Sequence, residues 1–172
     1  SISIDGPDAA SHNAFRGVPG AFEASMHGIE YLKQAGVPFQ INTTVTTNNL
    51  DSFEDIFVLA QGLGAVAWHI FLLVPTGRAA ALQEEIISAS EYERILNWFY
   101  DFRRQTDMHL KATCAPHYHR ILRQRAKAEG IAVTQENFGL DAVSRGCLGG
   151  IGFCFISHSG QVQPCGYLEL DC

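Results

Sequence analysis

The sequence predicts an α/β fold in which helices connect the strands of a parallel sheet. Strand-like and helix-like hydrophobic periods alternate from residue 1 to about residue 108, which is the pattern of a parallel sheet with crossover connections. Residues 67–74 are apolar on both faces, as expected of a buried parallel strand. Residues 130–145 show no clear period, and the cysteine-rich residues 147–172 follow them. We therefore expect an α/β part followed by a small cysteine-rich segment.

The first strand is predicted at residues 1–5, where isoleucines alternate with polar side chains. A Gly-Pro-Asp break follows it, and we expect a loop to about Gly20 that carries His12 and Arg16. A helix is predicted after this loop, because apolar side chains recur at helical spacing until Gly36.

The second strand is predicted at residues 38–46, which alternate with a period of two. A helix with an apolar stripe follows, and residues 67–74 form the third strand. Ser88 or Ser90, each followed three residues later by glutamate, can cap the next helix. We then expect a strand at 109–113, a helix from Pro116 to about residue 127, and a hairpin turned at residues 159–160.

The first two strands differ in the chemistry of their two faces. Helices should cover the apolar face, formed by Ile2, Ile4, Phe39, Ile41 and Val45. The opposite face is polar, which indicates room for a ligand, because a packed barrel interior would be filled by aliphatic side chains. A solvent-facing sheet edge is the alternative. The polar face comprises Ser3, Asp5, Gln40, Asn42, Thr44 and Thr46.

Four of the five cysteines lie in residues 147–172. Glycines and a proline stand beside most of these sulfurs, so the backbone can turn around an ion or cluster. The intervening gaps are six, ten and six residues, whereas structural zinc sites usually contain a tight Cys-x-x-Cys pair. We therefore favour an iron–sulfur site over zinc, and over disulfides, which an odd cysteine count disfavours. The cysteines are Cys114, Cys147, Cys154, Cys165 and Cys172.

The charge and hydropathy of the chain exclude two classes of protein. A net charge of −6 argues against a general nucleic-acid binder, although residues 111–145 carry six basic and three acidic side chains. No apolar run approaches the roughly 20 residues needed to cross a bilayer, and no signal pattern opens the chain. We therefore expect a cytoplasmic protein. The abrupt start in a strand and the end on a cysteine predict a fragment of a longer protein.

These residues resemble the radical SAM enzymes. Ser3-Ile4-Asp5-Gly6-Pro7, with His12 and Arg16 after it, is similar to the fourth strand and following loop of that six-stranded partial barrel. Cys147, twelve residues, Gly160, four residues and Cys165 resemble the opening of the SPASM or twitch auxiliary-cluster extension. Residues 113–120 with 145–147 look closest to the haem-biosynthesis branch of Fe-coproporphyrin decarboxylases and NirJ-like enzymes. The resemblance implies the second half of a partial (β/α)6 barrel at residues 1–108, a connecting strand, basic helix and linker at 109–146, and a truncated auxiliary-cluster segment at 147–172.

The resemblance also implies site residues. Ser3 and Arg16 match positions that contact S-adenosylmethionine, Asp5 lies on the same face, and Val74 matches a position near the adenine. Cys147, Cys165 and Cys172 match ligands of an auxiliary 4Fe–4S cluster, with Cys154 as companion and Cys114 as a possible replacement. The Cys-x-x-x-Cys-x-x-Cys loop of the family is absent from this sequence, so the chain alone is expected to be inactive.

The function implied is oxidative decarboxylation of Fe-coproporphyrin propionates to vinyl groups, with a tetrapyrrole substrate and an electron donor protein as partners. The catalytic residues stay unknown. A radical SAM peptide maturase is an alternative, because such enzymes share the auxiliary-cluster extension. A non-catalytic zinc or iron–sulfur module that binds a partner is another. An ordinary barrel hydrolase or aldolase has no support, since no strand-end lysine, serine elbow or carboxylate pair occurs.

Overall fold

The computed structural model describes residues 1–143, 147–168 and 170. It divides into two compact units, which are described separately. The first unit comprises Ser1–Leu73 with Glu85–Ala115, and the second comprises Val74–Glu84 with Pro116–Cys172. No helix among the described residues has both the length and the apolar character needed to cross a membrane.

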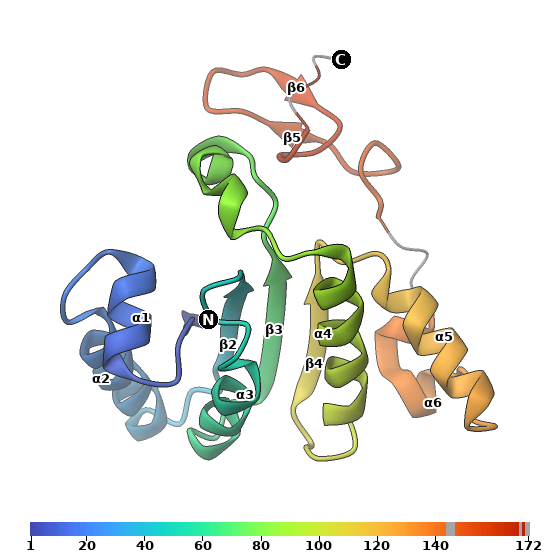
Figure 1. The fold of residues 1–172 in the computed structure, drawn as a ribbon, viewed down its shortest axis with the longest axis horizontal. Helices are drawn as coiled ribbons and strands as arrows, with labels where there is room; N and C mark the ends of the chain where they lie inside the picture. The colour runs from blue at the N-terminus through green and yellow to red at the C-terminus, as the bar shows by residue number, and fades with distance from the viewer. Residues whose placement is uncertain (144–146, 169, 171–172) are drawn as a thin grey trace. The chain divides into compact units, whose positions relative to one another are not determined.

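The first unit is built on a four-stranded parallel sheet with strand order β1-β2-β3-β4 (Figure 1). Helices connect each strand to the next, as the alternating periods predicted, and the α/β fold class is confirmed. The strands are β1 (Ile2–Ser3), β2 (Gln40–Val45), β3 (Ala67–Leu72) and β4 (His109–Thr113), and the connecting helices are α1 (Ala9–Arg16), α2 (Ala21–Gln34), α3 (Phe53–Gly62) and α4 (Ala89–Phe102).

Helix α1 lies where the sequence predicted a loop, and that prediction was wrong. The Asp8 side chain accepts a hydrogen bond from the Ser11 N–H and so caps the first turn. Gly17, at φ 64°, ends the helix in the left-handed conformation that glycine adopts without strain. Because Phe15 is the one large apolar side chain in this short helix, the periodic signal is weak, and the two caps were the better evidence.

The apolar face of the sheet carries the core of the first unit. Ile4, Ile41 and Val45 are completely buried, as predicted for the face that the helices cover. On β3, Trp68 is buried among aromatic rings from α3 and α4, with ring centroids 5.0 Å from Phe53 and 5.6 Å from Phe99. Burial of such rings contributes about 1.5–3 kcal/mol each. This core packs against β2 and β3 on the side of the sheet opposite to the polar face.

The polar face of the sheet agrees with the prediction except at two residues. Gln40, Asn42 and Thr44 are half-buried. Asp5 and Thr46 are buried instead, 1% and 0% exposed, because the chain turns away from the sheet after β1 and after β2. Their side chains therefore lie buried just beyond the ends of β1 and β2, and not on the polar face.

The second unit contains a 3-10 segment, two short helical pieces, a longer helix and a hairpin. Helix α5 (Tyr118–Ala128) confirms the predicted helix after Pro116 and buries Tyr118, Ile121, Leu122 and Ala126. Strands β5 (Phe155–Ile156) and β6 (Val162–Gln163) pair antiparallel and confirm the predicted hairpin. The remaining elements are η1 (Gly77–Glu85), α6 (Gln135–Phe138) and η2 (Gly139–Ala142). The domain boundaries implied by the resemblance stay a prediction.

Candidate functional site

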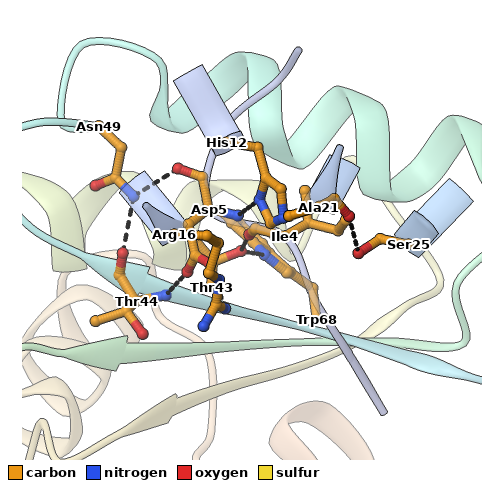
Figure 2. Close-up of polar contacts among 10 residues, drawn as sticks. All are labelled: Ile4, Asp5, His12, Arg16, Ala21, Ser25, Thr43, Thr44, Asn49 and Trp68. Carbon is orange, nitrogen blue, oxygen red and sulfur yellow. Dashed lines mark hydrogen bonds and ion pairs between the residues drawn. The ribbon is translucent and has the colours of Figure 1, made fainter. Parts of the chain in front are cut away.

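Asp5 is the centre of a polar network just beyond the end of β1. Its N–H donates to His12 Nδ1 at 3.0 Å, and its carbonyl accepts from Asn49 Nδ2 at 3.0 Å. Its carboxylate accepts the Thr44 N–H through Oδ1 at 2.7 Å and forms an ion pair with the Arg16 guanidinium through Oδ2 (Figure 2). The N–H, the carbonyl and Oδ1 of Asp5 are therefore hydrogen-bonded, and Oδ2 is paired with a positive charge, as a buried charged residue requires.

Two further residues fix the strand ends around Asp5. Asn49 also donates to the Thr44 carbonyl at 2.8 Å, so its amide joins the end of β1 to the end of β2. Thr43 donates its hydroxyl to the Ile4 carbonyl at 2.7 Å and accepts the Trp68 indole N–H at 2.9 Å. The aromatic core and the Asp5 network are thus connected by hydrogen bonds.

Helix α1 presents His12 and Arg16 on one face, because residues four apart lie one turn above each other. Gly6 lets this helix approach the end of β1. A Cβ at position 6 would lie 2.3 Å from Ser11 Oγ and 2.6 Å from the His12 backbone nitrogen. Since the backbone nitrogen cannot rotate away, only glycine fits at this position.

Burial sets the charge states in the network. Desolvation raises the pKa of the Asp5 carboxyl above its usual 3.8, while the Thr44 N–H and the Arg16 guanidinium act in the opposite direction. Desolvation lowers the pKa of His12 below 6.5, so the imidazole is neutral at pH 7. Because His12 Nδ1 accepts the Asp5 N–H, the ring proton of the neutral form is on Nε2.

An open hollow of about 410 Å³ lies beside this network. It offers the Ser3 hydroxyl, the His12 ring and the Arg16 guanidinium, and the side chain of Arg16 is 36% exposed. Its remaining wall is partly apolar. An anionic group on a partly apolar molecule suits this lining, because a guanidinium binds a carboxylate through two parallel hydrogen bonds. The lining residues are Ser1, Ile2, Ser3, His12, Arg16, Val18, Ala21 and Ser25.

A row of polar side chains extends from Ser3 across the sheet. The strand register places Ser3 beside Asn42, Asn42 beside His69, and His69 beside Lys111. Gln40 Nε2 contacts both Asn42 Oδ1, at 2.8 Å, and His69 Nδ1, at 3.1 Å. The hollow therefore opens at one end of a polar row that follows the sheet to β4.

The structure brings Ser3, Asp5 and Arg16 together, as the resemblance implied. Their role in binding a cofactor stays a prediction. Val74 belongs to the second unit, where it is half-buried. Its predicted position near an adenine also stays a prediction.

Two cysteines of the second unit face the same glycine. A Cβ on Gly149 would lie 3.5 Å from Cys147 Sγ and 3.4 Å from Cys165 Cβ. The Gly149 N–H points at Cys147 Sγ at 3.4 Å, and the Tyr167 N–H points at Cys165 Sγ at 3.5 Å. Two sulfurs beside one glycine, each contacted by a backbone N–H, are compatible with ligands of an iron–sulfur cluster or a metal.

The other predicted ligands are dispersed. Cys154 is exposed in the second unit, and Cys114 follows β4 in the first unit with an unusual φ of 57°. Cys172 lies outside the described residues. The four described cysteines are all free thiols. Within the described part of the chain, no group of three or more His, Cys, Asp or Glu side chains is arranged to hold a metal ion.

No protein-family model matches the chain. The AdoMet-dependent heme synthase of Nitratidesulfovibrio vulgaris is 77% identical over 172 residues, which cover 100% of this chain and 47% of that protein. The AdoMet-dependent heme synthase of Methanosarcina barkeri is 55% identical over 170 residues, covering 99% of this chain and 48% of that protein. Along its whole length, the chain is thus similar to about half of each of these AdoMet-dependent heme synthases. The predicted resemblance to radical SAM enzymes of the haem-biosynthesis branch is thereby confirmed.

The chain spans about half the length of these heme synthases. A solved structure, native anSMEcpe with bound AdoMet and Kp18Cys peptide, matches with a TM-score of 0.56 at 18% identity. The match covers 98% of this chain and 44% of that one. At this identity the likeness concerns the fold, and it agrees with half of a radical SAM barrel.

Proposed function

We propose that the full-length protein containing this chain is a radical SAM enzyme that converts Fe-coproporphyrin propionates to vinyl groups by oxidative decarboxylation. The observation that carries this proposal is the 77% identity to an AdoMet-dependent heme synthase over the whole chain. The Asp5-anchored Arg16 beside an open hollow supports it, because the arrangement suits a ligand carboxylate.

In this proposal, the first unit binds S-adenosylmethionine. Arg16 holds the carboxylate of the methionine part, and Ser3 donates its hydroxyl to a ligand oxygen. Asp5 keeps the guanidinium oriented before the ligand arrives, which lowers the entropic cost of binding. When bound and reductively cleaved, S-adenosylmethionine supplies the radical that abstracts hydrogen from a propionate.

The substrate carboxylates need cationic or hydrogen-bonding partners near the cofactor. Lys111 is exposed at the far end of the polar row that starts at Ser3. Neighbouring strands lie about 4.8 Å apart, so the row is long enough to lie along a tetrapyrrole. We infer that Lys111 binds a substrate propionate.

The cysteine segment holds an auxiliary 4Fe–4S cluster in this proposal. Cys147 and Cys165 are ligands, Cys154 and Cys172 complete the set, and Cys114 is the alternative to one of them. The electron donor protein would supply the electron that cleaves S-adenosylmethionine, and the cluster would accept the electron released when the substrate radical loses carbon dioxide to form the vinyl group. We expect the enzyme in the cytoplasm, without a nucleic-acid partner.

The test uses the full-length protein, reconstituted with iron and sulfide without oxygen. We expect it to bind S-adenosylmethionine and to release carbon dioxide from Fe-coproporphyrin. Arg16→Ala should abolish binding of S-adenosylmethionine, and Cys147→Ala or Cys165→Ala should each remove about four iron and four sulfide per chain. The proposal is wrong if the wild-type protein binds S-adenosylmethionine but leaves every tetrapyrrole unchanged, or if it binds no S-adenosylmethionine.

A further inference from the structure

One polar atom at the hollow is not used by the Asp5 network. His12 is 1% exposed and lines the hollow. Its Nδ1 is occupied by the Asp5 N–H, which leaves the ring proton on Nε2. Within the described residues, no acceptor is paired with this Nε2–H. This nitrogen is not sealed from solvent, and because His12 lines the open hollow, its Nε2–H is available to an acceptor that a ligand supplies.

We propose that His12 is a ligand-contacting residue of the hollow, and that its Nε2–H donates a hydrogen bond to the same anionic group that Arg16 binds. His12 and Arg16 are one turn apart on α1, and both line the hollow. A carboxylate has two oxygens that together accept about four hydrogen bonds, so a guanidinium and an imidazole can share it. The inference rests on the proposed function for the identity of the anion, the carboxylate of S-adenosylmethionine.

The surroundings of His12 require the imidazole to be neutral for this role. A protonated ring would carry a hydrogen on Nδ1, directed at the Asp5 N–H, and would repel Arg16. The edge of the ring also contacts Phe22, with the centroids 5.8 Å apart. The hydrogen bond from Asp5 and the contact with Phe22 thus hold the ring in one orientation, and its remaining nitrogen is preorganised for a ligand.

Substitutions of His12 can distinguish the roles of its two ring nitrogens. Asparagine places an acceptor near the position of Nδ1, so His12→Asn keeps the contact with the Asp5 N–H and removes the Nε2–H. Glutamine reaches the position of Nε2, so His12→Gln restores a donor to the ligand. His27 on α2 is exposed and outside the hollow, which makes His27→Asn a matched control.

The experiment measures equilibrium binding of S-adenosylmethionine and of decarboxylated S-adenosylmethionine to the full-length reconstituted protein. We expect His12→Asn to weaken binding of S-adenosylmethionine about tenfold, the value of a hydrogen bond to a charged group. Binding of the decarboxylated ligand should not change, His12→Gln should recover part of the loss, and His27→Asn should bind as wild type. Unchanged thermal unfolding of His12→Asn excludes a general loss of structure.

The outcomes separate this inference from the proposed function. If Arg16→Ala abolishes binding of S-adenosylmethionine and His12→Asn leaves it unchanged, His12 has only a structural role and the inference is wrong. An equal loss for both ligands in His12→Asn overturns it as well, because the contact would then not be to the carboxylate. If the wild-type protein binds neither ligand, the proposed function fails and the inference falls with it.

Discussion

The hollow beside Arg16 and the cysteine segment differ in how completely the fold builds them. Around Asp5, groups from β2, α1 and the loop after β2 form hydrogen bonds or an ion pair with every polar atom of one buried residue. In the cysteine segment, Cys147 and Cys154 are exposed, and the described contacts to sulfur are two backbone N–H groups. The first site is preorganised by the core. For the proposed cluster site, we expect the local structure to depend on the bound metal, because metal binding and local folding are coupled.

Of the substitutions that test this difference, Asp5→Ala should lower the free energy of unfolding the most. Removing the buried carboxylate leaves the Thr44 N–H without its acceptor and the partly exposed Arg16 without its ion-pair partner, and should cost about 3 kcal/mol. Urea unfolding of the full-length protein measures the loss. Asp107→Ala, at an exposed position, is the control and should change the free energy of unfolding by less than about 0.5 kcal/mol. A loss as small for Asp5→Ala would show that the network is not what holds the site.

Gly6→Ala should have the next largest effect. Its methyl group would overlap the His12 backbone nitrogen, so α1 must move away from the end of β1. Overpacking of this kind costs about 1–3 kcal/mol. Gly62→Ala is the matched control, since a Cβ there meets nothing within 4 Å. Equal unfolding midpoints for the two variants would contradict the close approach of α1.

Trp68→Phe tests the hydrogen bond that connects the aromatic core to the site. The ring stays apolar and nearly fills the space, but Thr43 loses the indole N–H, which should cost about 1–2 kcal/mol. A double-mutant cycle with Thr43→Val measures the coupling between the two residues. Additive losses, with no coupling, would mean that the hydrogen bond contributes nothing.

The effect of pH on the free energy of unfolding should be smaller than the effects of these substitutions. The pKa of His12 is lowered in the folded protein, so its contribution is complete above the unfolded value of about 6.5 and is lost as the pH falls through the folded pKa. The raised pKa of Asp5 acts oppositely, since its effect is complete below 3.8 and is lost as the pH rises through its folded pKa. The free energy of unfolding should therefore fall below pH 6.5, and His12→Asn should remove that slope. Glu23 also acts on His12, so Glu23→Gln is measured beside it.

Cys147→Ala gives the smallest expected effect on the first unit. It removes a predicted cluster ligand in the second unit, so the unfolding of the sheet, followed by Trp68 emission, should shift by less than about 0.5 kcal/mol. Limited proteolysis of residues 147–168 should accelerate in the same variant. A large loss of sheet stability would show that the two sites depend on each other.

The sequence predicted most of the first unit because its strands show a clear period of two. The same signal placed Ile4 and Ile41 on the buried face and Ser3 and Asn42 on the polar face. Helix α1 was missed because its caps, Asp8 and Gly17, carry more information than its weak periodicity.

At the site, the resemblance identified Ser3, Asp5 and Arg16, but Asn49 and Trp68 were not recognised as parts of it. Asn49 contacts the Asp5 carbonyl across 44 residues of sequence, and Trp68 contacts Thr43 across 25. Such contacts follow from the strand register, which the local pattern does not determine. The cysteine spacing likewise identified candidate ligands, but it did not show that Cys147 and Cys165 share one glycine.

The hydrogen bonds from Trp68 to Thr43 and from Thr43 to Ile4 also have a spectroscopic consequence. Trp68 is one of the two tryptophans of this chain and is completely buried. Its indole N–H donates to the Thr43 hydroxyl, which in turn donates to the carbonyl of Ile4, the residue before Asp5. Indole emission depends on the electric field around that N–H, so an anionic ligand that binds the Arg16 guanidinium should shift the emission of Trp68. With Trp98→Phe removing the second signal of this chain, the molecule carries its own fluorescent reporter behind the hollow.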